Sequence, residues 1–204
     1  MAVFTGARNG RVLRIEDPTA AGRRDLVVAL READAYPLPL PSWEADDENG
    51  VVMLCRDGEV PLASARLVVR RRDDRRRWGY VPAEMIDALP PGVPRVVFCE
   101  RLVSTRGARS LDLLALLLYV TATVGLERLG GVRDYVAVVQ PATERLIAWF
   151  GGRRLTGPLP LPGLDITGVL MAGDMTETAE RAGAMLDARG WTVTRHDTTG
   201  TTVR

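Results

Sequence analysis

The 204 residues are enough for one globular domain, and a composition of 46% hydrophobic and 26% charged residues is that of an ordinary soluble protein. The 27 basic and 26 acidic residues leave a net charge of +1, which gives no reason to expect nucleic acid as a partner. Every basic residue is an arginine. Schiff-base and P-loop lysine chemistry are therefore excluded.

The sequence gives little support for metal or disulfide chemistry. Cys55 and Cys99 lie in apolar, strand-like runs without a partner motif, which predicts buried free thiols. His196 lies in a polar stretch, so we expect neither a metal site nor a Ser-His-Asp triad. The N-terminus lacks a signal-peptide pattern, and the apolar run after Leu111 is too short to span a bilayer. We therefore expect a cytoplasmic protein without a membrane span.

The first half of the chain predicts a leader, a helix and a hairpin. Residues 1–22 read as a leader, and we expect a single domain over residues 23–204. Residues 23–35 have the apolar spacing of a helix. The hairpin follows over residues 51–70, where two β-rich runs are joined by Asp57-Gly58, a strong signal for a tight turn.

The hairpin ends in an arginine-rich run over residues 70–77, which also holds Asp73 and Asp74. Such a run more often forms a solvated connection than a ligand-binding patch, and we expect the connection here.

The second half of the chain alternates helices and strands. We expect helices over residues 82–89, 111–130, 142–150 and 176–189, and strands over residues 96–104, 134–139, 166–171 and 191–196. This pattern predicts an α/β (α+β) fold, with a mixed central sheet and helices on both of its faces.

The loop between the strand at 96–104 and the helix at 111–130 is the clearest candidate binding site. A helix N-terminus offers unpaired N–H groups and a partial positive charge, both of which suit a phosphate. Two guanidinium groups and a glycine add charge and room for a ligand to approach. The candidate loop consists of Arg106, Gly107, Ala108, Arg109 and Ser110. The pattern predicts a phosphate-bearing cofactor.

In this order the elements resemble the GCN5-related N-acetyltransferase (GNAT) superfamily, and within it the acyl-homoserine-lactone synthases and long-chain N-acyl amino acid synthases. Residues 96–130 resemble the acyl-CoA pyrophosphate loop, with one glycine where the superfamily usually has two. Ala65-Arg66-Leu67 resembles an Arg-Leu pair of that branch, and Glu100-Arg101 resembles its strand that bears a Glu and an Arg. Residues 140–158 resemble its downstream helix and Gly-Pro arm.

The resemblance implies a GNAT-like sheet and an acyl thioester as donor, either acyl-CoA or the phosphopantetheine of an acyl-carrier protein. Its pantetheine arm would pair with the backbone of the strand through Val103, and its phosphates would lie at residues 106–110. With a carrier protein as donor, the same arginines would meet its acidic face.

For catalysis the resemblance points to Glu100 and Arg101. The family places its Glu three residues before the Arg, which is Phe98 here, and strand alternation points Phe98 and Glu100 to the same face. Glu100 is the candidate base, acting directly or through a water. A structural ion pair with a neighbouring arginine is the alternative role.

A further set of residues is expected around the acceptor. Arg66 and Arg101 could bind a substrate carboxylate in bidentate fashion, or could pair with the acidic patch instead. Trp43 is more typical of a packing anchor than of a substrate platform, and Tyr119 of a core residue. The expected substrate-binding residues are Arg31, Trp43, Asp46, Asp47, Arg66 and Phe98. The acidic patch is Glu44-Ala45-Asp46-Asp47-Glu48, and Asp46, Asp47 and Glu48 are its expected partners for the arginines.

Two functions from different classes follow. The first is an N-acyltransferase that moves an acyl group from a thioester to the amine of an amino acid or small metabolite, in signal or secondary-metabolite biosynthesis. The second is a catalytically inactive binding module for an acyl thioester or a protein partner. The displaced carboxylate and the single-glycine loop favour the module. The retained Arg66, Arg101 and acidic patch favour the enzyme, which is the function we expect.

Overall fold

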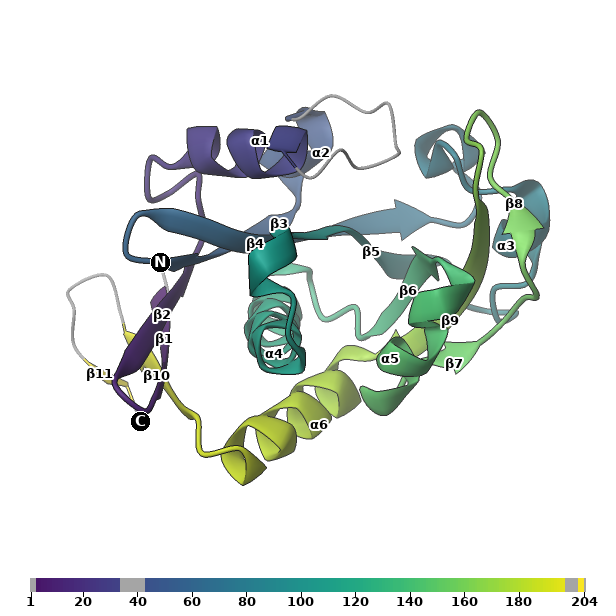
Figure 1. Ribbon diagram of the computed structural model, residues 1–204. Coiled ribbons are helices and arrows are strands. Elements are labelled where there is room, and N and C mark those ends of the chain that lie inside the picture. The colour runs from purple at the N-terminus through teal and green to yellow at the C-terminus, as the bar shows by residue number, and fades with distance from the viewer. Residues whose placement is uncertain (1–2, 34–42, 197–201, 204) are drawn as a thin grey trace.

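The computed structural model describes residues 3–33, 43–196 and 202–203, and its centre is one twisted sheet (Figure 1). The strands follow one another in the order β11-β10-β1-β2-β3-β4-β5-β6-β9-β7, and β8 pairs with β9 beside this path. The strands are β1 (Val3–Arg8), β2 (Arg11–Glu16), β3 (Val51–Asp57), β4 (Val60–Arg71), β5 (Arg95–Ser104), β6 (Asp134–Val139), β7 (Arg153–Arg154), β8 (Leu159–Pro160), β9 (Thr167–Asp174), β10 (Thr192–His196) and β11 (Thr202–Val203).

Helices cover both faces of this sheet, as expected from the sequence. On one face, α1 and α2 lie over β3 and β4; on the other, α4 lies against the same strands and α6 packs along α4 (Figure 1). The helices are α1 (Arg24–Ala33), α2 (Ala45–Asn49), α3 (Ala83–Asp87), α4 (Leu111–Arg128), α5 (Glu144–Trp149) and α6 (Met175–Ala188), with 3-10 turns at Arg75–Trp78, Arg106–Ala108 and Pro141–Thr143. No helix of the described residues is both long and apolar enough to cross a membrane.

The main core lies between α4 and the inner face of the sheet. Leu116 and Leu117 of α4 are fully buried there against Phe4, Met53 and Leu67 of the strands. Because α4 is apolar around most of its circumference, it fits a position between the sheet and α6. The helix is thereby fixed with its N-terminus at the edge of the cavity described below.

The expected hairpin, helices and later strands are confirmed, and the segment expected as a leader lies in the sheet. Residues 3–16 form β1 and β2, which pair with each other, with β10 and with β3. Their turn is Asn9-Gly10, and both residues have positive φ, as a tight hairpin turn requires. The pairing of β1 with β10 and of β2 with β3 holds this segment in the sheet, against α4.

The sheet opens between β5 and β6. These parallel strands pair only at Val97↔Tyr135 and Phe98↔Val136, after which β5 stays with β4 and β6 continues beside β9. From Cys99 onward, the edge of β5 therefore faces β6 without backbone hydrogen bonds between the two strands. Parallel strands that part in this way leave backbone N–H and C=O groups directed into the gap.

Gly50 sets how closely α2 approaches the sheet, and a methyl group there has no room. A Cβ at this position would lie 2.5 Å from the backbone oxygen of Leu67 and 2.8 Å from that of Asp46. We expect Gly50→Ala to lower the free energy of unfolding by about 1–3 kcal/mol, because backbone must move to relieve the overlap. Urea unfolding measures this. Gly157→Ala, where nothing lies within 4 Å, is the control and should leave stability unchanged.

Candidate active site

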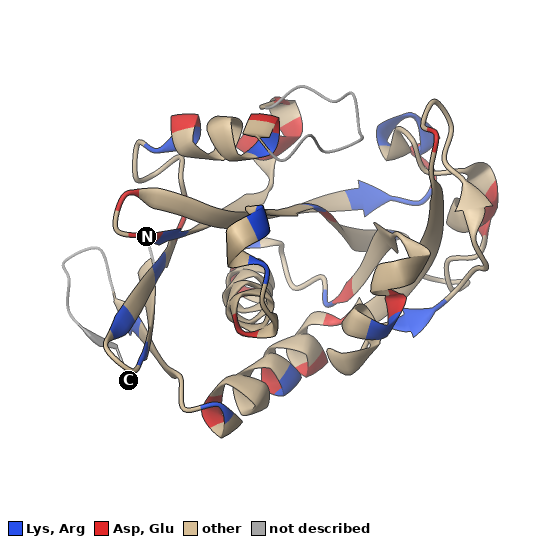
Figure 2. Ribbon diagram, viewed as in Figure 1, with Lys and Arg blue, Asp and Glu red and all other residues tan. Residues whose placement is uncertain are grey.

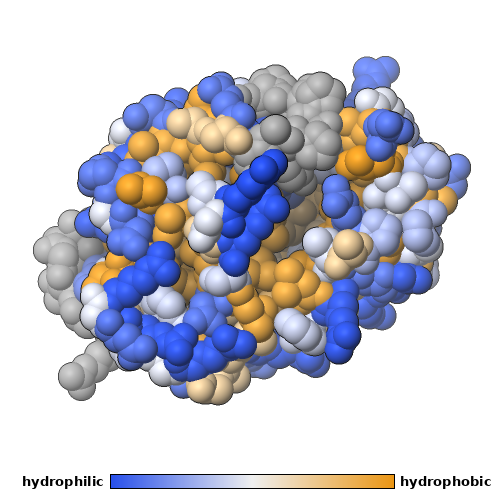
Figure 3. All heavy atoms as spheres, in the orientation of Figure 1, coloured by the Kyte–Doolittle hydropathy of each residue, from blue (hydrophilic) through white to orange (hydrophobic). Residues whose placement is uncertain are grey.

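A cavity of about 720 Å³ occupies the opening between β5 and β6, a volume within the range of small-molecule sites. Its wall on the α4 side is apolar and includes Leu113, Leu114, Leu117, Leu118 and Ala122. Its wall on the α1–α2 side holds Tyr80, Glu100, Arg101, Leu161 and Ile166. In the face of the molecule that Figure 3 shows, hydrophobic residues gather around a hollow. The cavity therefore joins an apolar half to a charged half through the opening in the sheet.

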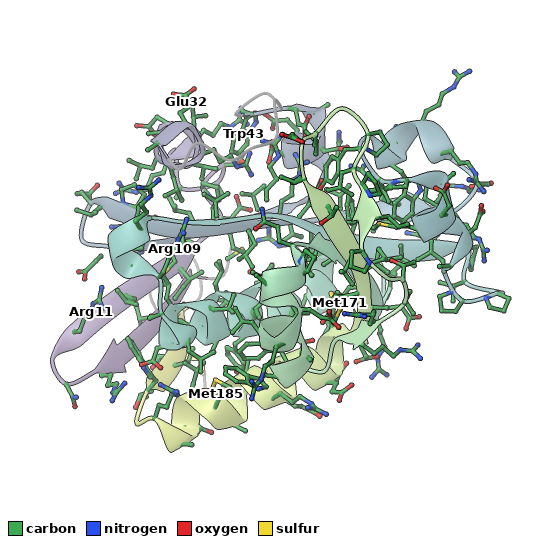
Figure 4. The ribbon with its side chains drawn as sticks, turned by 45° about the vertical axis from the view of Figure 1, so that its right-hand side comes forward. Arg11, Glu32, Trp43, Arg109, Met171 and Met185 are labelled. Atoms are coloured by element: carbon green, nitrogen blue, oxygen red, sulfur yellow. The ribbon has the colours of Figure 1, made fainter. Side chains whose placement is uncertain are left out.

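The N-terminus of α4 forms one end of the cavity. Ser110 caps the helix, its Oγ accepting a hydrogen bond from the Leu113 N–H at 3.1 Å. Arg109 lines the cavity and lies at the start of α4 (Figure 4), while Arg106 is exposed on the turn before it. A Cβ added to Gly107 would meet nothing within 4 Å. The loop thus combines a helix N-terminus, two exposed guanidinium groups and open space, which are the features of an anion site.

Two other members of the expected donor site have mainly packing roles. Ala108 packs against the main core. The side chain of Val103 is buried among Val27, Leu30 and Val52 on the opposite face, so only its backbone could serve a ligand. Its neighbours Leu102 and Ser104 do line the cavity.

A buried cluster of charges covers the other half of the cavity, beneath α1 and α2. It joins Arg31, Arg66, Arg70 and Arg101 to Glu44, Asp46, Asp47 and Glu100. Acidic and basic segments adjoin one another on these helices (Figure 2). The cluster holds as many arginines as carboxylates, which lets so many charges be buried together.

Arg66 is the centre of this cluster, with only 1% of its side chain exposed. Its Nη2 lies 2.7 Å from Oε1 of Glu100 and 2.6 Å from Oε1 of Glu44, and its Nη1 lies 3.0 Å from Oδ2 of Asp47. Of the two roles considered for Arg66, carboxylate binding within the protein is the one that its contacts support.

A β-bulge places Glu100 and Arg101 on the same face of β5. The register shifts opposite Ala65, between Ser64↔Val103 and Arg66↔Glu100, and Arg101 has a φ of 55°. Strict alternation would send these neighbours to opposite faces. Instead Glu100 meets Arg66 and Arg70, while Nη2 of Arg101 donates to Oε1 of Glu44 at 3.0 Å.

The acidic patch pairs differently from the expectation. Asp46 binds Arg70 and Asp47 binds Arg31 and Arg66, but Glu48 turns away from the cluster to Arg24 and to Nε1 of Trp43. Glu48 lies about 100° around the helix from the inward-facing Asp47. Glu44 takes its expected place as partner of Arg66 and Arg101.

Trp43 and Phe98 have packing contacts, as an anchor would. The guanidinium groups of Arg24 and Arg31 lie 5.3 and 5.9 Å from the Trp43 ring, which lies close to α1 (Figure 4). Phe98 is buried against Trp78, with 5.5 Å between ring centroids. Phe98 and Glu100 do share a face of β5, since both lie on the side of α1–α3.

Burial raises the pKa of the Glu100 carboxyl above its ordinary value, and the guanidinium groups of Arg66 and Arg70 partly oppose this. A carboxylate with a raised pKa is better matched to taking up a proton near neutral pH. The hydrogen bond from Arg70 lowers the pKa of Asp46, which keeps this more exposed carboxyl ionised. Glu100, which also lines the cavity, is thus suited to act as a base.

The cysteines and the histidine take no part in such chemistry. Burial raises the pKa of both Cys55 and Cys99 to about 12, so neither is a thiolate at neutral pH. His196 lies on β10, with its Nε2 2.9 Å from Oγ1 of Thr5. Among the described residues no group of His, Cys, Asp and Glu could hold a metal ion.

Several site residues were missed from the sequence. Arg70 looked like the start of a solvated connection, and the exposed pairs from Arg71 onward do form one, but Arg70 itself is buried in the cluster. Glu44 begins the acidic patch, but Asp46, Asp47 and Glu48 were the residues expected to pair with the arginines. Tyr135 lines the cavity, whereas Tyr119 packs toward Gly183 of α6.

This arrangement of strands and helices is the GNAT fold, as the resemblance implied. One similar structure is FeeM, an N-acyl amino acid synthase from uncultured soil microbes, with a TM-score of 0.60 and 14% identity over 84% of this chain and 94% of that chain. An acyl-CoA N-acyltransferase from Pseudomonas aeruginosa has a TM-score of 0.54 and 18% identity over 79% and 97%. MesI, a CoA-dependent acyl-homoserine lactone synthase, has a TM-score of 0.55 and 17% identity over 86% and 94%.

No protein-family model matches the sequence, and no curated protein matches it. At these identities the likeness establishes the fold. The chemistry must be argued from the residues themselves.

Proposed function

We propose that the protein is an N-acyltransferase that moves an acyl group from an acyl thioester to the amine of an amino acid or another small metabolite. The observation that carries this proposal is the cavity itself, which runs from the anion site at Arg109 through the opening in the sheet to the carboxylate of Glu100. A thioester donor and an amine could therefore meet at the opening, each entering from its own half.

The donor would lie along the unpaired edge of β5. Residues 99–104 of this edge offer backbone groups to the amides of a pantetheine arm, and the loop at residues 106–110 offers an anion site to its phosphates. The donor is acyl-CoA or an acyl-carrier protein, since both present the same phosphopantetheine.

The apolar half of the cavity favours an acyl group larger than acetyl. From Leu111 to Ala122, the cavity-lining part of α4 rises about 16 Å. Each CH₂ group buried there contributes about 0.8 kcal/mol to donor binding. A medium or long chain would use this wall, and an acetyl group would leave most of it bare.

Once the amine is neutral, the reaction needs one proton acceptor. The amine nitrogen attacks the thioester carbonyl carbon, a C–N bond forms, and the C–S bond breaks to release the thiol. The proton lost by the nitrogen passes to Glu100, directly or through a water, and an equivalent proton is taken up by the departing sulfur. Positioning of the two reactants supplies most of the acceleration, and the base adds about 10²–10⁴-fold.

Gly107 provides a test of the donor site that leaves the acceptor side untouched. We expect Gly107→Val to raise the KM for acyl-CoA by about tenfold or more, because the new side chain would occupy the open space that a phosphate needs. Gly157→Val, also in open space, is the matched control and should leave KM unchanged. An unaltered KM in Gly107→Val would contradict the placement of the phosphates at this loop.

One observation favours a binding module instead. Oε1 of Glu100 lies within hydrogen-bond distance of nitrogen atoms of both Arg66 and Arg70, so the carboxylate is already engaged in ion pairs. In a module, these pairs would hold the fold together and nothing more.

Mass spectrometry of the purified protein with a series of acyl-CoAs and a pool of amines and amino acids separates the two functions. The enzyme is supported by an N-acylated product that requires the protein and acyl-CoA together. Tight binding of acyl-CoA without product across the pool would establish the module.

A further inference from the structure

We propose that the acceptor is an amine without a carboxylate group, so that amino acids are poor substrates. This inference rests on the proposed function and narrows it. It follows from the charges that face the acceptor half of the cavity.

The arginines of this half are already matched by carboxylates of the protein. Arg101 lines the cavity, and its Nη2 donates to Glu44; Arg66 binds Glu44, Asp47 and Glu100. Among the described residues that line the cavity, one cation besides Arg101 is present. It is Arg109, which lies at the donor end. An acceptor carboxylate would therefore find its guanidinium partners occupied.

The more exposed charges of the cluster are acidic, since the side chains of Glu44 and Asp46 are 28% and 27% exposed. Where the cluster reaches the molecular surface, it thus presents negative charge.

Arg70 is the arginine of the cluster with the most unused donors among the described residues. Its Nε and Nη1 are buried without a hydrogen-bond partner in the described part of the chain, but Arg70 is not among the residues that line the cavity. Its Nη2 is bound to Asp46 and lies 3.3 Å from Glu100. A carboxylate would have to displace these acids to reach it.

An amino acid in the site would consequently place its carboxylate beside Glu100, which lines the cavity, unless it took Arg101 from Glu44. Either outcome leaves a negative charge in or near the cluster without a partner, which is costly in a buried site. The amine that has the same side chain but no carboxylate brings no unpaired negative charge into the site. Before it is deprotonated, its positive charge is attracted by the acidic residues.

Matched pairs of acceptors test this inference. We compare phenethylamine with phenylalanine, tyramine with tyrosine, and isoamylamine with leucine, using one acyl-CoA and measuring kcat/KM by mass spectrometry. We expect the amine of each pair to be preferred by at least about tenfold, the effect of a lost ion pair or an unpaired charge. Equal or higher kcat/KM for the amino acids would overturn the inference.

Glu44→Gln should shift this preference in a defined direction. The amide removes the charge that holds Arg101 and still accepts a hydrogen bond, so Arg101 becomes available to a substrate carboxylate. We expect the preference for the amine to shrink by about tenfold in this variant. Glu48→Gln is the control, because Glu48 lies on the same helix and binds Arg24 instead. A preference that is unchanged in Glu44→Gln would contradict the role of Arg101.

Calorimetric titration of the protein with the same amines and amino acids measures binding apart from turnover. The two measurements together distinguish a failure of this inference from a failure of the proposed function. Binding of the amines over the amino acids, without turnover of either, would support the inference and overturn the enzyme. Turnover of amino acids over amines would overturn the inference and support the enzyme. Neither binding nor turnover of either class would overturn both.

Discussion

Replacing Arg66 with methionine lowers the free energy of unfolding by about 3–5 kcal/mol, the usual cost of removing one partner from a buried ion pair. The loss is large because Arg66 contacts three carboxylates and is 1% exposed. Without it, Glu100 and Asp47 are left in a buried site with fewer partners. Methionine fills a similar volume, so an ordinary cavity contributes little to the effect.

Urea unfolding measures this loss, and Arg71→Met is the matched control. Arg71 lies on the same strand, but its pair with Asp73 is exposed to solvent, so its replacement should leave the unfolding midpoint unchanged. If Arg66→Met proves too unstable to purify, Arg66→Lys retains the charge and should give an intermediate midpoint. A midpoint for Arg66→Met equal to that of Arg71→Met would show that the cluster does not stabilise the fold.

Replacing Glu100 with glutamine lowers kcat by about 10²–10⁴-fold, the range of a lost general base. Glutamine has the same shape and can still accept hydrogen bonds from Arg66, but it cannot take up the proton of the amine. Binding of acyl-CoA should stay the same, because the donor lies along β5 and the α4 loop. A kcat within a few-fold of the wild type would show that Glu100 is a structural partner of Arg66 and Arg70.

The dependence of activity on pH identifies the same group. Because burial raises the pKa of Glu100, the wild type should gain activity as the pH rises through a midpoint above the ordinary glutamate value of about 4.3. Glu100→Gln should lack this rise.

Linkage gives the matching effect on stability. A pKa that is higher in the folded state contributes stability that is present below the unfolded pKa and is lost as the pH rises through the folded pKa. The wild type should therefore lose stability relative to Glu100→Gln over that interval, and unfolding at a series of pH values measures it. A stability difference that does not vary over the interval would show that the pKa of Glu100 is not raised.

Much of the fold follows from local signals in the sequence. The Asp57-Gly58 turn between two β-rich runs, and the apolar run after Leu111, are strong enough to define β3, β4 and α4 alone. The first hairpin was missed because its inward positions are not uniformly apolar. Gly6 lies where a Cβ would come within 2.8 Å of Leu116, so close packing against α4 replaces the hydrophobic pattern.

The site was predictable in composition but less so in geometry. The residues of the α4 loop and the pair Glu100-Arg101 could be chosen from the sequence. The bulge that turns Glu100 and Arg101 to one face has no local signal, since it depends on the pairing of β5 with β4.

The same holds for α2, a five-residue helix of mostly acidic residues with no apolar periodicity. Tertiary ion pairs hold it in place, including those from Asp46 to Arg70 and from Asp47 to Arg66. Contacts between residues far apart in the chain therefore decide which carboxylate meets which arginine.

The most direct measurement is a crystal structure of the protein with a non-hydrolysable long-chain acyl-CoA analogue. We expect its phosphates at residues 106–110, its pantetheine arm along β5 from Cys99 to Ser104, and its acyl chain against Leu114 and Leu117 of α4. The thioester position should then lie in the opening of the sheet, on the side of Glu100. An analogue bound elsewhere, or with its chain outside the α4 wall, would contradict acyl transfer in this cavity.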